Sequence, residues 1–323
     1  MSSVSELLGL VSDDLARVEV KMLATDEVFR PLASAVNLLL DSGGKRIRPA
    51  LAVMTSRLYA NVDNEKVICL AAALEMLHSA TLVHDDVIDG ALVRRGSPTL
   101  NASWTLGATI LAGDFVFARA ASLASDTDSV RVMKIFSQTL LTICEGEIRQ
   151  LYAIGDWNQP KAAYYERIYG KTAALFAAAT ESAAVLVSAP EEEISALREF
   201  GYNIGMAFQI MDDLLDFVGD QQVIGKPVGN DLRQGTVTLP VFHFLQVHPE
   251  AIEIIEATSN GHSSTDSLTQ LIADIGDSSA IEATRQEAVD FVEKAKTILA
   301  QWPDGPYRSA MLQLSDYVVA RSL

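Results

Sequence analysis

The feature that most constrains this chain is a pair of aspartate triplets, each set in an apolar stretch. The triplets are Asp85, Asp86 and Asp89 in TLVHDDVID, and Asp212, Asp213 and Asp216 in FQIMDDLLD. Helix positions i and i+4 share a face, so each triplet concentrates negative charge on one side of a helix. Such carboxylates repel one another and add no stability to an apolar helix. The pattern therefore predicts two helices that present carboxylates to a cation.

The composition places these two helices in a wholly helical chain. Hydrophobic residues make up 49% of the 323 residues, and only 19 glycines and 10 prolines occur, which favours a large helical core. The segments expected to be helical are 5–23, 26–40, 64–89, 103–123, 128–152, 161–187, 191–218, 238–247, 264–275, 278–301 and 307–322. Residues 90–100 are expected to form a loop. Because no proline-rich or serine-rich linker and no alternating strand pattern interrupts these segments, we predict one all-α domain, a single large helical bundle over residues 1–323.

Charge and cysteine usage exclude several classes of protein. Lys and Arg number 25 against 42 Asp and Glu, a net charge of −17, which argues against a nucleic-acid surface. Cys69 and Cys144 lie in apolar stretches without metal-ligand spacing, so we expect two buried thiols in a reducing compartment. The N-terminal residues lack signal-peptide features, and the longest apolar stretch, 67–83, is too short to span a bilayer comfortably. We expect a soluble, cytoplasmic protein with no transmembrane segment.

The aspartates predict a particular metal. Oxygen ligands with no cysteine and few histidines suit Mg²⁺ and suit Zn²⁺ poorly. Because Mg²⁺ keeps waters and completes its shell with substrate phosphates, six carboxylates would hold several Mg²⁺ ions around a diphosphate. The metals would make this diphosphate a better leaving group. The allylic carbocation left behind would be sheltered from water by apolar helix walls.

Basic residues around the first triplet predict a second anion site. They are Lys45, Arg48, His78, Arg94 and Arg95. Taken singly, the lysine and arginines could be solvated or could balance the aspartates, and the histidine could be a hydrogen-bonded core residue. In a chain with a net charge of −17, their grouping favours the anion site.

Five motifs, in family order over most of the chain, resemble the trans-isoprenyl diphosphate synthases of the polyprenyl synthase type. They are GGKRIRP (43–49), LHSATLVHDDVIDGALVRRG (77–96), GKT (170–172), FQIMDDLLD (208–216) and GKPVGNDLRQGTVTLP (225–240). The resemblance implies an isoprenoid-synthase helical bundle with the two aspartate boxes facing each other across a deep cavity, usually as a homodimer. It also implies that an allylic diphosphate ionises, isopentenyl diphosphate attacks the cation, and a proton passes to the released diphosphate. No side-chain general base is required, which agrees with the absence of a Ser-His-Asp or Cys-His pattern.

The resemblance also implies residue roles. Asp85, Asp86, Asp89 and Asp212 would bind the Mg²⁺ held by the allylic diphosphate, with Asp213 and Asp216 supporting them. Arg94, Lys171, Thr172, Gln209 and Lys226 would contact that diphosphate or its metals, and Lys45, Arg48, His78 and Arg95 would hold isopentenyl diphosphate. We expect Lys171, Lys226 and the four metal-binding aspartates to be catalytic. Many members carry a lysine where this chain has Thr236, which puts a diphosphate contact from that position in doubt.

Small residues before the first triplet predict the product length. Ala80 and Thr81, one turn before Asp85, would form the first floor beneath a growing chain, and relatives that stop early typically have an aromatic residue there. Leu77 and Ala73 follow at further turns, each about 5.4 Å long. We expect an all-trans product of roughly six to ten isoprene units from that pitch. Alternatively, the small residues merely allow close helix packing, and Phe136 or Met54 provides a higher floor.

Other functions remain to be weighed against this one. A short-chain farnesyl or geranylgeranyl diphosphate synthase would share every motif. A non-catalytic subunit of a heteromeric synthase would not need both aspartate boxes, and a terpene cyclase would not need Lys45, Arg48 and Arg95. A membrane prenyltransferase would need spanning segments, and a purely structural bundle would leave the polar residues within the apolar helices unexplained.

Overall fold

The computed structural model describes residues 7–23, 29–41, 44–60, 62–94, 96–219, 228–259 and 265–321. The chain divides into two compact units. Unit 1 comprises Met1–Gln138, Leu175–Arg198 and Leu299–Leu314, and unit 2 comprises Thr139–Ala174, Glu199–Ile298 and Ser315–Leu323. The prediction of a single domain stays a prediction. The described residues are almost entirely helical, so the all-α prediction is confirmed.

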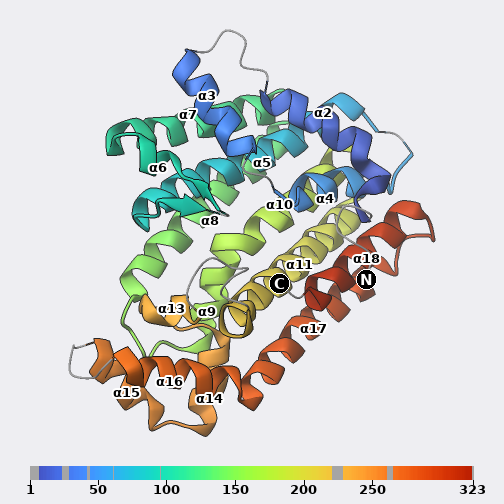
Figure 1. The fold of residues 1–323 in the computed structure, drawn as a ribbon. Coiled ribbons are helices and arrows are strands. Elements are labelled where there is room, and N and C mark those ends of the chain that lie inside the picture. Colours follow the sequence, from blue (N-terminus) through green and yellow to red (C-terminus); the bar gives the residue numbers. More distant parts are fainter. Residues whose placement is uncertain are drawn as a thin grey trace. The chain divides into compact units, whose positions relative to one another are not determined.

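Figure 1 labels the helices, which are divided between the two units as follows. Unit 1 holds η1 (Gly9–Val11), α2 (Ser12–Leu23), α3 (Arg30–Asp41), α4 (Ile47–Ser56), α5 (Asn64–Ile88), β1 (Val93–Arg94), β2 (Ser97–Pro98), α6 (Leu100–Ser103), α7 (Leu106–Ser125) and nearly all of α10 (Ala174–Leu186). Unit 2 holds α9 (Lys161–Ile168), η2 (Tyr169–Ala173), α13 (Asn230–Arg233), α14 (Leu239–Val247), α15 (Ala251–Ser259), α16 (Thr265–Gly276) and nearly all of α17 (Ser279–Leu299). Helices α8 (Val130–Ala153), α11 (Glu191–Val218) and α18 (Pro306–Ala320) contribute residues to both units.

Helix α5 forms the core of unit 1 and carries the first aspartate triplet at its end. The Asp63 side chain caps its first turn by accepting hydrogen bonds from the backbone N–H groups of Glu65 and Lys66. Residues 67–77 are all buried, and the helix packs against α2, α4 and α7. A helix that is apolar all round requires neighbours on every side. The predicted helix over 64–89 is therefore confirmed to within one residue.

Residues 90–100, predicted as a loop, contain a short antiparallel hairpin. Val93 pairs with Pro98 and Arg94 pairs with Ser97. Gly96 has φ +78°, a conformation that glycine adopts without steric cost. Strands of two residues are too short to produce an alternating pattern, so they cannot be predicted from sequence periodicity. The hairpin returns Arg94 to the end of α5.

The single helix predicted over 161–187 is instead α9, the π-helical turn η2 and α10. Within this stretch, Gly170 approaches α8 closely. A Cβ atom at Gly170 would lie 3.0 Å from the Cα of Gly146 and 3.0 Å from the carbonyl oxygen of Thr142. Single π-helical turns are frequent at functional sites, and this one carries Lys171 and Thr172.

An apolar cluster in unit 2 contains residues of α11, α13, α14, α15 and α16, together with Trp157 from the segment between α8 and α9. Its largest members include Trp157, Phe217, Leu232, Phe244 and Ile272. Helix α15, of nine residues, was not predicted. The predicted helix over 103–123 corresponds to α7, which begins three residues later, and the short helix α6 before it was not predicted. The other predicted helices occur with ends shifted by a few residues. Parts of three predictions fall on residues 24–28, 260–264 and 322, which lie outside the described residues.

The two cysteines differ in exposure. Cys69 is buried as predicted, but Cys144 is exposed, so the prediction of two buried thiols is wrong for Cys144. Cys144 lies on α8 with Leu141, Ile148 and Leu151 at spacings of three and four residues, and all four side chains are exposed. The error arose because an apolar stripe at helical spacing has the same sequence pattern whether its own chain covers it or not.

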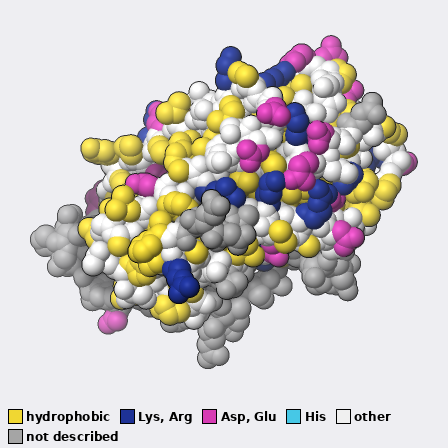
Figure 2. Space-filling view, turned by 90° about the horizontal axis from the view of Figure 1, so that it is seen from above, with side chains coloured by type: hydrophobic (Ala, Val, Ile, Leu, Met, Phe, Trp, Pro, Cys, Tyr) yellow, Lys and Arg dark blue, Asp and Glu magenta, His cyan; other side chains and the backbone are white. Residues whose placement is uncertain are grey.

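Two helices, α5 and α7, are long and apolar enough to cross a bilayer by length and composition alone. Within α5, 78% of the apolar window is buried inside the protein, as in the core helix of a soluble protein, whereas 33% is buried in α7. Figure 2 shows a face on which acidic and basic side chains are interspersed with hydrophobic ones. The expectation of no transmembrane segment stays a prediction.

Candidate active site

The first aspartate box lies at the end of α5, where the helix leaves the core. Asp86 is turned inward and only 5% exposed, and its Oδ1 atom accepts a hydrogen bond of 2.7 Å from Nε of Arg94. Asp85 is half-buried, and Asp89, the C-cap residue, is exposed. In this box Asp86 is therefore buried and bonded to Arg94, while Asp85 and Asp89 keep contact with solvent.

The residues expected to hold isopentenyl diphosphate lie at the start of α4 and on α5. Lys45 is exposed just before α4. Arg48 is half-buried, with its guanidinium carbon 4.8 Å from the ring centroid of Phe176, within the range of a cation–π contact. His78 is half-buried on α5, two turns before Asp85. All belong to unit 1, and Arg95 lies outside the described residues.

The second aspartate box, on α11, also has a buried second aspartate that protein donors hold. Asp213 is 4% exposed, and both its carboxylate oxygens accept hydrogen bonds of 2.8 Å, Oδ1 from Nε2 of Gln209 and Oδ2 from the hydroxyl of Tyr164. The Thr172 hydroxyl contacts Oε1 of Gln209 at 2.5 Å. Burial, with the nearby Asp231 carboxylate, raises the pKa of Asp213, although the bonds from Gln209 and Tyr164 act in the opposite direction.

Asp212 and Asp216, the first and third aspartates of the second box, also contact the protein. Asp212 has a 44% exposed side chain and forms an ion pair of 2.7 Å with Nη1 of Arg321. Asp216 is half-buried, and its Oδ2 accepts a hydrogen bond of 3.1 Å from the backbone N–H of Asp231. The backbone N–H of Thr236 donates to the carbonyl of Asp231 in the same turn. This turn, with α13, is therefore fixed against the box.

The remaining predicted contacts of the allylic diphosphate lie on or near η2. Lys171 is exposed, and its Nζ atom lies 3.6 Å from Oε1 of Glu147 and 3.3 Å from Oε1 of Gln150. Thr172 is buried and is joined through Gln209 to the second box. Lys226 lies outside the described residues. The π-helical turn thus brings Thr172 to the box, while the Lys171 side chain reaches the surface.

Tyr164 and Arg321 contact aspartates of the second box, and neither was predicted from the sequence. Tyr164 precedes Asp213 by 49 positions, and Arg321 follows Asp212 by more than a hundred. A buried tyrosine and a near-terminal arginine are common in helical proteins, and no local spacing connects them to the boxes. A buried carboxylate does require a donor, but the sequence does not show which one.

The predicted floor residues lie on a face of α5 that becomes more exposed toward the box. Ala73 and Leu77 are fully buried, and Ala80 is 2% exposed. Thr81 is half-buried, and its hydroxyl donates to the carbonyl of His78. The next residue at this spacing, Asp85, is half-buried as well. The small side chains therefore lie beneath the carboxylates, as the sequence predicts.

The donors of the boxes suit a hard cation. Within the described ranges, no three carboxylate, imidazole or thiol groups surround a common metal-sized space. Mg²⁺ does not require such a cage, since it binds through one or two carboxylates, waters and substrate phosphates. Asp85, Asp89 and Asp212 carry oxygen ligands that solvent can reach. The residues present therefore fit Mg²⁺ bound together with a diphosphate.

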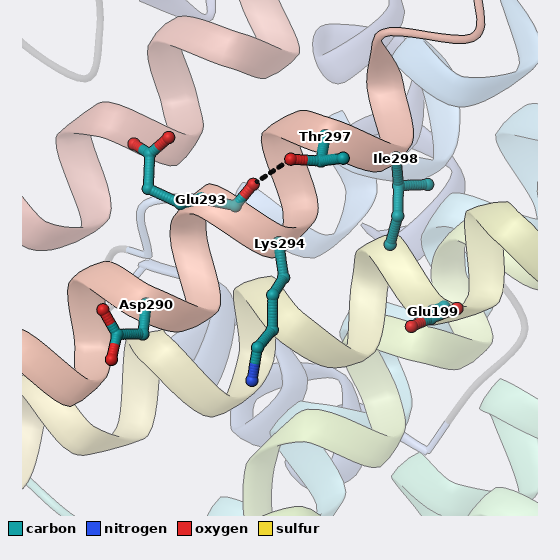
Figure 3. A pocket seen from close by; sticks show the side chains of 6 residues that line it. All are labelled: Glu199, Asp290, Glu293, Lys294, Thr297 and Ile298. Atoms are coloured by element: carbon teal, nitrogen blue, oxygen red, sulfur yellow. Dashed lines mark hydrogen bonds between the residues drawn. The ribbon is translucent and has the colours of Figure 1, made fainter.

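A separate open hollow lies between α11 and α17 in unit 2 (Figure 3). Its lining residues are Glu199, Asp290, Glu293, Lys294, Thr297 and Ile298. The Thr297 hydroxyl bonds to the carbonyl oxygen of Glu293, one turn earlier in its own helix. None of these residues belongs to the motifs of the aspartate boxes, and we assign this hollow no part in the chemistry.

Comparison with known proteins identifies the family. The polyprenyl synthetase family model matches residues 30–275. The heptaprenyl diphosphate synthase component 2 of Geobacillus stearothermophilus is 36% identical over 98% of this chain and 98% of its own length. The chain therefore belongs to the polyprenyl synthetase family, the trans-isoprenyl diphosphate synthases, and it is a prenyltransferase. The resemblance inferred from the motifs is confirmed.

Solved structures agree with this assignment. A decaprenyl diphosphate synthase from Rhodobacter capsulatus superposes with a TM-score of 0.90 at 36% identity, covering 99% of this chain and 100% of that chain. A polyprenyl synthase from Caulobacter crescentus CB15, complexed with calcium and isoprenyl diphosphate, also has a TM-score of 0.90, at 37% identity, with 99% and 98% covered. The predicted isoprenoid-synthase fold is confirmed.

Proposed function

We propose that this chain condenses isopentenyl diphosphate with an allylic diphosphate, using Mg²⁺, to give a medium-to-long all-trans polyprenyl diphosphate. The observation that carries the proposal is the matched construction of the two aspartate boxes. In each box the second aspartate is buried and held by protein donors, Asp86 by Arg94 and Asp213 by Tyr164 and Gln209. The flanking aspartates keep contact with solvent. Hydrogen-bonded partners of this kind orient the carboxylates of a metal site.

The metal would be held chiefly by the accessible carboxylates. In the first box we assign metal contacts to Asp85 and Asp89, with Asp86 supporting them. In the second box we assign a metal contact to Asp212, with Asp213 and Asp216 supporting it. Bound Mg²⁺ supplies charge neutralisation that makes the allylic diphosphate a better leaving group. The Caulobacter crescentus relative, which is complexed with calcium and isoprenyl diphosphate, supports this assignment.

Basic residues of this chain would bind the two diphosphates. Lys45, Arg48 and His78 are accessible or half-buried within unit 1 and would hold isopentenyl diphosphate, with Arg95. On the allylic side, Lys171 is exposed next to η2, and Lys226 and the Thr172–Gln209 pair would complete the contacts. Arg94 would act through Asp86, to which it is bonded. The proton lost in condensation would pass to the released diphosphate.

Product length is proposed from the relatives and from α5 together. The relatives named above are a heptaprenyl synthase component and a decaprenyl synthase. In this chain the residues before the first box are Ala80 and Thr81, and neither is aromatic. An all-trans product of roughly six to ten isoprene units follows if each unit spans about one 5.4 Å helical turn. The floor residues would be Leu77, Ala80 and Thr81.

We propose that the active form is a soluble, cytoplasmic homodimer. Exposed apolar side chains lie on α7 at Leu106, Ile110 and Leu111, and the stripe around Cys144 lies on α8. Uncovered apolar faces of this kind mark contact surfaces in soluble proteins. Cys144 would react slowly with an alkylating reagent in a dimer and rapidly after an Ile148→Glu substitution that separates the copies. Rapid reaction in the wild-type protein, together with a monomeric mass by light scattering, would exclude this interface.

Turnover by the purified chain tests the central proposal. The protein is incubated with Mg²⁺, isopentenyl diphosphate labelled with ¹⁴C, and geranyl, farnesyl or geranylgeranyl diphosphate, and the products are resolved by chain length. Elongation past the geranylgeranyl product is expected. Products that stop there would identify a short-chain synthase, and no turnover without a second polypeptide would identify a subunit of a heteromeric enzyme.

A further inference from the structure

Arg46 has an unusual backbone between the predicted diphosphate residues Lys45 and Arg48. Its φ is +48° and its ψ is +32°, in the left-handed region, which L-residues other than glycine, asparagine and aspartate rarely occupy. Its carbonyl oxygen accepts the backbone hydrogen bond from Ala50 that starts helix α4. The conformation of Arg46 therefore sets the direction of the chain on both sides, through Lys45 before it and Arg48 after it. Such a conformation persists where the surrounding structure holds it.

The guanidinium group of Arg46 is held at three points. Its Nη1 atom donates to Oε1 of Glu75 at 2.9 Å, Nη2 donates to the carbonyl oxygen of Leu40 at 3.1 Å, and Nε lies 3.3 Å from Oε1 of Glu19. Glu75 is 4% exposed, so its charge requires a partner. Leu40 lies in the last turn of α3, where carbonyl groups lack helical partners. One side chain thus joins α3, α5 and the start of α4.

The backbone packs closely over this ion pair. A Cβ atom at Gly44 would lie 3.1 Å from Nη1 of Arg46 and 3.4 Å from Oε1 of Glu75. Glu75 and His78 are three residues apart on α5 and so share a face of the helix. The Arg46–Glu75 pair therefore fixes the segment that carries Lys45 and Arg48 against the face of α5 that carries His78.

We propose that Arg46 is a positioning residue, which through Glu75 fixes Lys45 and Arg48 for the diphosphate of isopentenyl diphosphate. This inference rests on the proposed function, because it takes these residues as the isopentenyl diphosphate contacts. The guanidinium group of Arg46 is itself hydrogen-bonded to Glu75, Glu19 and the carbonyl oxygen of Leu40. Its side chain therefore acts on the ligand through the loop.

Arg46→Asn is the sharpest variant, because asparagine tolerates the left-handed backbone while removing the guanidinium. The matched control is Arg57→Asn. Arg57, at the other end of α4, pairs through Nη2 with both carboxylate oxygens of Asp14 at 3.0 and 3.1 Å. Arg46→Asn could fail to fold because it leaves Glu75 charged and buried. In that case the double variant Arg46→Asn with Glu75→Gln, which removes both charges, replaces it in the same measurements.

Calorimetric titration with isopentenyl diphosphate alone and with farnesyl diphosphate alone gives the decisive readout, together with the KM for each in turnover. For isopentenyl diphosphate, Arg46→Asn should raise the dissociation constant and the KM about ten-fold or more, because displacement of a positioning group weakens the contacts that it positions. The same variant should leave the dissociation constant of farnesyl diphosphate unchanged. Arg57→Asn should change neither. Arg46→Lys should recover only part of the loss, because an ammonium group cannot reproduce the fork of donors.

Equal weakening of both diphosphates, or an equal effect of Arg57→Asn, would show that the Arg46 pair serves only stability. Unchanged isopentenyl diphosphate binding in folded Arg46→Asn would overturn the inference while leaving the proposed function intact. A wild-type protein that neither binds nor consumes isopentenyl diphosphate would instead overturn the proposed function itself.

Discussion

Arg321 places its Nη1 atom 2.7 Å from Oδ1 of Asp212, in the second aspartate box. The guanidinium carbon lies 4.0 Å from the ring centroid of Phe208, and other guanidinium nitrogens donate to the carbonyl oxygens of Phe208 and Val318. The Arg321 side chain is 6% exposed, so its charge depends on Asp212 and on these oxygens. The C-terminal end of the described chain is thereby attached to the box.

The ion pair predicts that Asp212→Ala affects both activity and stability. Loss of a metal ligand should lower turnover at least about a hundred-fold, because the metal supplies several kcal/mol of charge stabilisation. The free energy of unfolding should also fall by about 1.5–3 kcal/mol, the usual contribution of a hydrogen bond to a charged group. Turnover with Mg²⁺ and urea denaturation measure the two effects.

Asp89→Ala is the control for stability. Asp89 is an exposed carboxylate at the C-terminal end of α5, where the helix dipole disfavours negative charge. Its removal should reduce turnover as strongly as Asp212→Ala but should not lower the free energy of unfolding, and relief of the dipole repulsion would raise it slightly. Unchanged stability in Asp212→Ala would show that Arg321 does not depend on the ion pair.

Tyr164→Phe should weaken metal binding through Asp213. The substitution removes only the hydroxyl that bonds Oδ2 of Asp213, and loss of such a supporting partner typically costs about ten- to a hundred-fold in metal affinity or activity. The concentration of Mg²⁺ required for half-maximal turnover should therefore rise. Tyr165→Phe is the matched control, since Tyr165 donates to Glu287 from the same helix and does not touch the box. An equal shift in Mg²⁺ requirement for both variants would contradict this role for Tyr164.

Local spacing in the sequence predicted most of the long helices and the helical position of both boxes, because positions i and i+4 share a helix face wherever the helix lies. It did not predict contacts between residues far apart in the chain, such as Tyr164 with Asp213 or Arg46 with Glu75, since many residues of the same type could fill either role. It also placed Cys144 in the core, because an exposed apolar stripe has the same period as a buried one. The hairpin at Arg94 was missed because two residues do not show a strand period.

Stability should depend on pH through Glu287, on α17. Burial alone would raise the pKa of this carboxyl group, but hydrogen bonds from His243, Lys161 and Tyr165 lower it to about 2, from 4.5. Because the pKa is lower in the folded protein, the stabilisation is present above about pH 4.5 and is lost as the pH falls toward about 2. Glu287→Gln should therefore unfold more easily at pH 7, and its difference from wild type should shrink below pH 4.5.

The measurement for Glu287 is the free energy of unfolding in urea from pH 7 to pH 3. Glu282→Gln, on the same helix, provides the control, because its side chain is 77% exposed and lies 3.9 Å from Arg285. Exposed pairs of this kind contribute little, so that variant should follow the wild-type protein at every pH. A Glu287→Gln deficit that stayed constant over this range would show that the Glu287 charge does not carry the effect.

The length of the product should depend on Ala80. If the growing chain runs from the aspartates along α5, a phenylalanine at this buried position would block it about one helical turn below the box. Ala80→Phe should then give mainly farnesyl or geranylgeranyl diphosphate, and Thr81→Phe should shorten the product similarly. The alternative is that Ala80 serves packing. One turn further on, His84 lies against α7 so closely that a Cβ atom at Gly113 would meet its ring at 2.3 Å.

Ala71→Phe distinguishes blockage from general disturbance of the core. Ala71 is fully buried on α5, and nine residues at 3.6 residues per turn place it on the side opposite to Ala80. Overpacking should cost both variants about 1–3 kcal/mol of stability, but only Ala80→Phe should change the distribution of chain lengths. If Ala80→Phe makes the products of the parent, the chain does not pass that face of α5, and Phe136 or Met54 becomes the candidate floor. If both variants shorten the product equally, the effect comes from disturbed packing.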